Sequence, residues 1–283
     1  MTQLVQLQNR IETFAAEGFK IYAISYDPPE AVAKFAASRR IEYDVLSDED
    51  SEVIRRYGIL NTLISPEDEA FKHPSTGKAF YGIPFPGTFV TDENGIVTEK
   101  FFDRHYATRA SAGTILDKAI SKVLVHDESL QTVAQGERAK IKAFLSDEDL
   151  KLEVKSTLYI RLEVAEGLHV YGEPLPEGFI PTTVEIKPIK GVRLYEPEYP
   201  KTHPIDFKGL GVKLNVYEHV VDIAVPLVAT AEVRGWGVPR SQNTVALEAR
   251  VTYQVCSDTV CFAPESVDLT LEVPLDELIR PGR

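Results

Sequence analysis

Residues 251–275 read VTYQVCSDTVCFAPESVDLTLEVPL and contain both cysteines of the chain, Cys256 and Cys261. Apolar residues recur at every second position before the pair, from Val245 to Val255, and again after it, from Val267 to Val273. Alternation with period two on both sides of a short polar gap is typical of an antiparallel hairpin with one buried face. We therefore predict that the strands before and after the cysteines pair with each other.

Four residues separate the two cysteines, so that they can face each other across the mouth of the hairpin. Opposed Cα atoms on antiparallel strands lie roughly 4.5–5.5 Å apart, within the range that a disulfide tolerates. If the alternation continues, Cys256 falls on the polar side of its strand and Cys261 on the inner side. Pro264 makes the assignment of Cys261 uncertain, because proline interrupts regular strand pairing. Three interpretations stay open: a redox-active pair, an inert local disulfide, and two unrelated thiols. Closing so short a loop stabilises a fold little, which favours exchange.

Three segments carry a resemblance: GLHVYGEPLPEGFIPTTVEI (167–186), VYEHVVDIAVPL (216–227) and the cysteine hairpin. Together they resemble the N-terminal periplasmic module of the thiol–disulfide interchange protein family DsbD, over about residues 151–278. The resemblance implies an immunoglobulin-like β-sandwich whose cysteine pair passes electrons to partner proteins. It also implies that Cys261 attacks and that Cys256 resolves the mixed disulfide.

In that family a cap loop with an aromatic residue shields the cysteines until a partner docks. The matching segment is His203–Lys208, so the resemblance implies Phe207 as the cap, with Asp206 beside it in partner docking. Tyr171, in HVYGEP, is expected near the cysteines by the same resemblance. The alternative for Tyr171 is a place in the core of the sandwich.

Composition bounds the remaining possibilities. The chain has 283 residues, 43% of them hydrophobic and 26% charged, which is ordinary for a soluble protein with two domains. Its formal charge of −12 disfavours nucleic acid and anionic membranes as partners. The six histidines show no paired ligand spacing with cysteine, so we expect neither a metal nor another cofactor.

The compartment stays open at this point. No run reaches transmembrane length, and the first residues read as an amphipathic helix instead of a signal peptide. The chain as written would stay in the cytoplasm, where disulfides are hard to keep oxidised, whereas the DsbD-like resemblance implies the periplasm.

The first half of the sequence alternates helical and strand-like segments. We predict a parallel α/β sheet with one antiparallel hairpin, because Asn94-Gly95 lies between two strand-like runs. The expected helices are 4–15, 28–36, 47–57 and 108–124, and the expected strands are 19–26, 43–46, 87–91 and 96–102. The strand at 19–26 is apolar on both faces, as a buried parallel strand should be.

Two segments of this half, YAISYDPPEAVAKFAASRRIEYDVLSDEDSEVIRRYGI (22–59) and GIPFPGTFVTDENGIV (82–97), carry a second resemblance. They resemble the thioredoxin-like fold, more narrowly the peroxiredoxin (AhpC/TSA, redoxin) family, over about residues 1–124. The resemblance places that group's cis-proline at Pro86, close to Thr88, and implies a cis Phe85–Pro86 bond beside a redox centre. The alternative is an ordinary loop.

The sequence departs from that family at its start. In these folds a strand ends in a Cys-x-x-Cys or single-Cys motif that begins the next helix, and Met1 already reads as part of that helix. Loss of the strand would leave unpaired backbone groups and an apolar gap, so the thioredoxin-like domain is expected to be incomplete. Either the sheet has rearranged or the protein is longer, for example through a selenocysteine codon misread as a stop.

We expect a thioredoxin-like domain at 1–126, a linker at 127–150 and a β-sandwich at 151–283. The expected function is thiol–disulfide exchange with a thioredoxin-like or other redox protein, and peroxide reduction if an upstream motif exists. The competing hypothesis is a non-catalytic thioredoxin-like scaffold joined to a protein-binding sandwich with a structural disulfide. A third is that each half acts only in a complex that supplies the missing strand.

Overall fold

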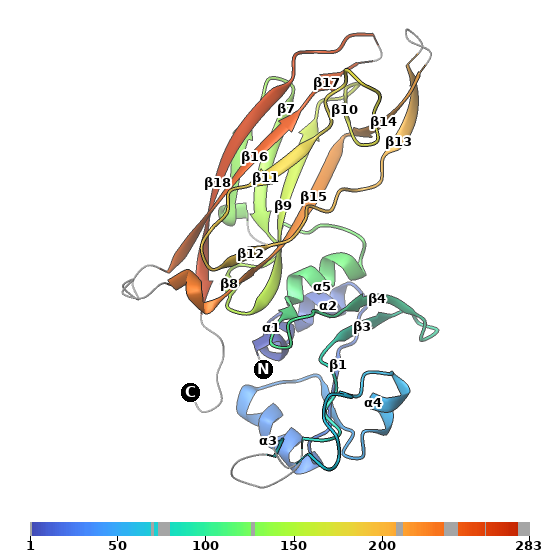
Figure 1. Cartoon of the computed structure of the whole chain (residues 1–283), viewed down its shortest axis with the longest axis vertical. Coiled ribbons are helices and arrows are strands. Elements are labelled where there is room, and N and C mark those ends of the chain that lie inside the picture. Colours follow the sequence, from blue (N-terminus) through green and yellow to red (C-terminus); the bar gives the residue numbers. More distant parts are fainter. Residues whose placement is uncertain are drawn as a thin grey trace. The chain divides into compact units, whose positions relative to one another are not determined.

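The computed structural model describes residues 2–68, 71–72, 80–125, 128–207, 212–234, 243–257 and 259–276. The chain divides into two compact units, of which the first extends to Ile120 and the second begins at Ser121 (Figure 1). None of the described helices is long and apolar enough to cross a membrane.

The helices of the first unit lie close to the predicted segments. Gly18 and Gly58 follow two of these helices with φ of +83° and +68°, a conformation in which glycine ends helices without strain. Ser111 begins the last helix, since its Oγ accepts a hydrogen bond from the Thr114 amide at 3.1 Å. The helices are α1 (Thr2–Asn9), α2 (Ile11–Ala16), α3 (Pro29–Arg39), α4 (Glu52–Arg56) and α5 (Ala112–Ala119).

The strands of the first unit form two separate pairs. Strands β1 (Tyr22–Ser25) and β2 (Asp44–Ser47) are parallel, and β3 (Thr88–Thr91) and β4 (Val97–Phe101) form the predicted antiparallel hairpin. A short β5 (Arg109–Ala110) follows. Both local pairings are therefore confirmed, whereas the continuous sheet is wrong for the described residues.

The prediction of a buried strand at 19–26 is also wrong. Tyr22 and Ile24 of β1 are 53% and 42% exposed. A two-stranded pair leaves much of each strand without a layer of side chains over it, so apolar sequence alone does not bury the strand.

The second unit is built almost entirely of strands, as the sequence predicts. Its sheets have the orders β13-β14-β10-β17, β11-β16-β18-β8 and β12-β15-β9-β7-β6. The strands are β6 (Gln131–Gln135), β7 (Ala139–Leu145), β8 (Leu150–Lys151), β9 (Val154–Val164), β10 (His169–Tyr171), β11 (Thr183–Ile186), β12 (Val192–Leu194), β13 (His203–Phe207), β14 (Val212–Glu218), β15 (Val220–Ala229), β16 (Thr244–Tyr253), β17 (Val255–Cys256) and β18 (Glu265–Asp276). Two short 3₁₀ helices, η1 (Glu128–Leu130) and η2 (Ala231–Arg234), complete it.

One continuous core lies between the sheets of the second unit. Alternate residues of β9 and β15, such as Ile160 and Ile223, contribute to it from one side, and Leu247 and Leu271 of β16 and β18 from the other. The apolar members of the alternating pattern are thus the buried ones, as in a β-sandwich. This arrangement is consistent with an immunoglobulin-like sandwich.

The segment expected to be a linker, 127–150, contains the paired strands β6 and β7. Strand β7 pairs with β9 along its length, from Ala139 opposite Val164 to Leu145 opposite Leu158, and Ile141 is fully buried. The sequence AKIKAFL in this segment alternates apolar and polar residues, a strand pattern that the charged residues around it obscured.

The predicted hairpin around the cysteines is confirmed. Strand β16 pairs with β18 in one antiparallel register, from Thr244 opposite Pro274 to Tyr253 opposite Glu265. The cysteines therefore lie at one end of a long hairpin that also supplies much of the core.

Candidate functional site

A tight turn brings the two cysteines together. The Phe262 amide donates to the Val255 carbonyl at 3.0 Å, and inside this pair the Ser257 amide donates to the Val260 carbonyl at 2.8 Å. Cys256 and Cys261 are consequently opposed as an antiparallel bridge, with their Cα atoms 4.1 Å apart, and a disulfide joins them. The prediction that they face each other is confirmed.

The two sulfur-bearing residues differ in burial. Cys256 is fully buried in a small cluster with Tyr171, Leu214 and Val216, separate from the main core. This agrees with its predicted parity, since Val255 faces the main core. Cys261 is exposed, so its expected inner parity is wrong. The turn between the cysteines interrupts the alternation, which resumes only in β18.

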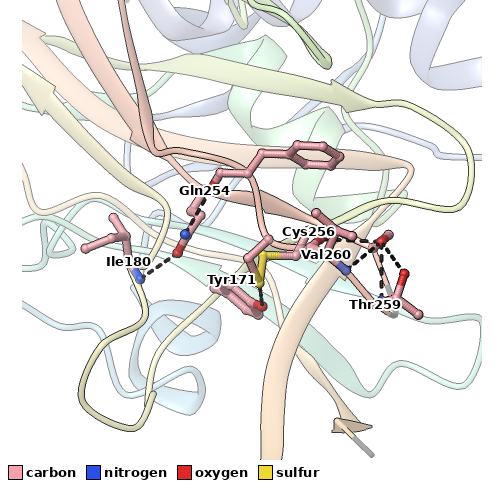
Figure 2. Close-up of a disulfide and its surroundings, with 9 residues drawn as sticks. Tyr171, Ile180, Gln254, Cys256, Thr259 and Val260 are labelled. Carbon is pink, nitrogen blue, oxygen red and sulfur yellow. Dashed lines mark hydrogen bonds between the residues drawn. A yellow bond between two sulfur atoms is a disulfide. The ribbon is translucent and has the colours of Figure 1, made fainter. Parts of the chain in front are cut away.

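Tyr171 lies directly against the disulfide. Its hydroxyl is 3.2 Å from Sγ of Cys261 (Figure 2), and because a disulfide sulfur carries no hydrogen, Tyr171 is the donor. Burial raises the pKa of Tyr171, so the phenol keeps its proton at neutral pH. The structure thus gives the pair a fixed hydrogen-bond donor.

Gln254 ties the cysteine turn to the segment that follows β10. Its Nε2 donates to the Phe262 carbonyl at 3.0 Å, and its Oε1 accepts from the Ile180 amide at 3.3 Å (Figure 2). In the same segment the ring of Phe179 packs edge-on against Tyr171, with centroids 5.2 Å apart. Residues 172–182 therefore lie beside the disulfide.

Sequence reasoning missed Gln254 and Phe179 as parts of this site. The signal for Gln254 was its place in the Tyr-Gln-x-Cys pattern, two residues before Cys256. Nothing in the local pattern around Phe179 distinguishes it from an ordinary loop residue, because its role depends on contacts with distant strands.

His169 was also missed, although it is two residues before Tyr171. It is opposite Cys256 on one neighbouring strand and opposite Glu218 on the other. Only 2% of His169 is exposed, and its ring lies 5.5 Å from that of Tyr171, centroid to centroid.

The expected cap segment forms β13 at the edge of its sheet. Strands β14 and β10 lie between β13 and β17, which carries Cys256. Asp206 is exposed and is opposite Lys213 of β14. The side chain of Phe207 and the whole of Lys208 lie outside the described residues, so the cap and docking roles stay predictions.

Pro86 and Thr88 belong to the first unit, and the expected cis bond before Pro86 is not found. Among the described residues the cis peptide bond is Glu173–Pro174, so Phe85–Pro86 is trans. The Phe85 amide donates to the Ile59 carbonyl at 2.6 Å next to an antiparallel bridge between Leu60 and Pro84, and the bond before Pro86 adopts the more stable trans isomer. Thr88 Oγ1 accepts from Gln3 Nε2 at 3.3 Å.

Two family models match the chain, one in each unit. Residues 1–100 match the AhpC/TSA family, and residues 135–272 match the family described as thiol:disulfide interchange protein DsbD, N-terminal. A search of the curated proteins found no match.

Similar solved structures include two bacterial domains. The N-terminal periplasmic domain of ScsB from Proteus mirabilis shares 14% identity with a TM-score of 0.35, covering 51% of this chain and 51% of that one. The DsbD N-terminal domain from Neisseria meningitidis, in the reduced form, shares 18% identity with a TM-score of 0.31, covering 53% and 91%. The chain thus spans about half the length of the ScsB domain. By these matches, residues 1–100 are similar to the AhpC/TSA family and residues 135–272 are similar to the DsbD N-terminal family.

Proposed function

We propose that the second unit is a thiol–disulfide exchange module whose redox centre is the Cys256–Cys261 pair. The observation that carries this proposal is the difference in burial between the two joined residues: Cys256 is fully buried and Cys261 is exposed. A partner can then reach one sulfur while the other is held inside the protein, which suits an attacking and a resolving cysteine.

The exchange has two steps. In the reduced protein the Cys261 thiolate attacks a sulfur of the partner's disulfide, that S–S bond breaks, and one partner sulfur leaves as a thiolate. The Cys256 thiolate then attacks Sγ of Cys261, the Cys256–Cys261 bond forms, and the second partner sulfur leaves. Two electrons pass from the pair to the partner, and the same steps in reverse pass them back.

The surroundings of the pair support these roles. The Tyr171 hydroxyl, which donates to Cys261 in the oxidised form, can stabilise a thiolate at the same sulfur after reduction. Gln254 and the turn hydrogen bonds hold the two cysteines opposed, so the resolving attack needs no large movement.

The partner we propose is a protein dithiol or disulfide of a thioredoxin-like or other redox protein. For the first unit we propose a thioredoxin-like arrangement, supported by the AhpC/TSA match, the parallel β1–β2 pair and the β3–β4 hairpin. Both cysteines of this sequence belong to the second unit, so the exchange chemistry is assigned to that unit.

Single-cysteine variants test the assignment. Cys256→Ser keeps the exposed cysteine, and Cys261→Ser keeps the buried one. We expect the reduced Cys256→Ser protein to form a mixed disulfide with the chromogenic disulfide DTNB at least about tenfold faster than Cys261→Ser. Equal rates, or a faster Cys261→Ser protein, would contradict the assignment of Cys261 as the attacking residue.

A further inference from the structure

His169 occupies a position between a sulfur and a carboxylate. It lies on β10, between β17 and β14, directly opposite Cys256 on one side and Glu218 on the other. Directly opposed residues of antiparallel strands point to the same face of a sheet, with their Cβ atoms about 4.5–5.5 Å apart. The imidazole therefore lies in one row with the Cys256 side chain and the Glu218 carboxylate.

Other ionisable groups lie near His169, Cys256 and Glu218 and affect where a proton can be held. On the same face Tyr171 keeps its proton, because burial raises its pKa. Glu218 Oε2 accepts from His203 Nε2 at 2.9 Å, so its charge is shared with a second histidine on β13. His169 and Cys256 are directly opposed on neighbouring strands, and both are buried. A neutral imidazole beside a thiol can accept the proton of that thiol.

We propose that His169 accepts and returns the proton of Cys256 during exchange, an inference that rests on the proposed function. In the resolving step the Cys256 thiol gives its proton to the imidazole, and the thiolate attacks Sγ of Cys261. The Cys256–Cys261 bond forms and the partner sulfur leaves as a thiolate. In the reverse direction a partner thiolate attacks Cys261, Cys256 leaves as a thiolate, and the imidazolium protonates it.

Burial explains why Cys256 needs such a group. A thiolate that forms in a buried, largely apolar cluster is destabilised by desolvation unless a positive charge lies beside it. The imidazolium would supply that charge at the sulfur, and Glu218 on its other side would stabilise the imidazolium. Cys261 has no such need, because it is exposed and receives a hydrogen bond from Tyr171.

The test is the release of thionitrobenzoate from DTNB by the reduced full-length protein. The first equivalent reports attack by Cys261, and the second reports resolution by Cys256. We expect His169→Gln to slow the second release about tenfold at pH 7 and to move its pH midpoint upward, because fewer Cys256 thiolates form. The first release should keep its rate. His105→Gln, the same change at an exposed histidine of the first unit, should alter neither phase.

The outcomes separate this inference from the proposed function. A His169→Gln protein with an unchanged pH midpoint for the second release would overturn the role of His169, while exchange itself stands. A wild-type protein that releases only one equivalent would show that Cys256 does not resolve, and both proposals would fail.

A measurement on the unmodified protein covers the case in which His169→Gln does not fold. NMR titration of the histidine ring protons should give His169 a higher pKa in the reduced protein than in the oxidised one, by about one unit or more, because the thiolate favours the imidazolium. Equal pKa values of His169 in the two redox forms would overturn the proposal.

Discussion

At the scale of single residues, the hydroxyl of Tyr171 contacts the sulfur of Cys261, the exposed member of the cysteine pair. Tyr171→Phe keeps the ring packing on Phe179 and removes only the hydroxyl 3.2 Å from Sγ. Without this donor the Cys261 thiolate is less stable, so we expect the thiol pKa to rise and the attack on DTNB at pH 7 to slow, by about tenfold for each unit of pKa.

The same substitution should cost little stability, about 0.5–1.5 kcal/mol of unfolding free energy in the oxidised protein, since one neutral hydrogen bond is lost. Tyr217→Phe removes a hydroxyl from a ring on the opposite face of the same sheet and is the matched control. A Tyr171→Phe protein that reacts as fast as the wild type, with the same pH midpoint, would show that the hydroxyl does not act on Cys261.

The sequence predicts which face of a strand a residue occupies only where the alternation of apolar and polar residues is unbroken. Cys256 follows the alternation of β16 directly, and its position off the main core was predictable. Cys261 lies beyond a turn, where hydrogen bonds of Ser257 set the chain direction and alternation no longer applies. His169 became visible only through the register of three strands that are far apart in sequence.

At the scale of elements, Gln254 connects the cysteine turn with residues 172–182. Gln254→Ala removes two hydrogen bonds, to Phe262 and from Ile180, and leaves the partly buried Phe262 carbonyl and the exposed Ile180 amide without these partners. We expect a loss of about 1–3 kcal/mol in urea unfolding and faster hydrogen exchange at the Ile180 amide. Thr252→Val removes an exposed hydroxyl pair with Ser266 on the same hairpin and should change stability by less than about 0.5 kcal/mol.

The turn between β6 and β7 is docked on the cysteine hairpin. A Cβ at Gly136 would lie 2.0 Å from Oη of Tyr253 and 2.8 Å from Oε2 of Glu265, whose carboxylate accepts from Tyr253 and from the Glu137 amide. We therefore expect Gly136→Ala to destabilise the second unit by about 1–3 kcal/mol in urea unfolding.

The control for this prediction is Val133→Ala on the adjacent β6, where the side chain is half exposed and the cost should be below about 0.5 kcal/mol. A Gly136→Ala protein as stable as the wild type would show that residues 131–145 are loosely attached, as a linker would be.

Most elements of both units follow from local patterns, and the errors have one cause. The helices, the Asn94-Gly95 hairpin and the cysteine hairpin are specified by nearby residues. The expected linker at 127–150 and the buried strand at 19–26 depended instead on which distant strands pair with them. The amino-acid composition of a segment does not show which distant strands pair with it.

At the scale of the whole molecule, the two units are expected to unfold independently. The second buries a large continuous core, whereas β1 and β2 of the first leave Tyr22, Ile24 and Leu46 substantially exposed. We predict two transitions in urea, with the first unit unfolding at the lower concentration, because it buries less apolar surface.

Matched core truncations assign the transitions. Leu116 is fully buried in the first unit, so Leu116→Ala should lower the unfolding free energy of the first transition by about 2–5 kcal/mol. Ile160→Ala should lower the unfolding free energy of the second transition by a similar amount. A single transition that both variants shift equally would contradict independent units.

The measurement that tests the central claim most directly is the reduction potential of the Cys256–Cys261 pair. It is obtained by equilibrating the protein in glutathione buffers and counting free thiols by mass spectrometry after alkylation. We predict a potential above roughly −300 mV, so that the pair interconverts within the range of cellular redox proteins. A potential well below that value, with a disulfide that persists in excess reduced glutathione, would show a structural bond and contradict the exchange function.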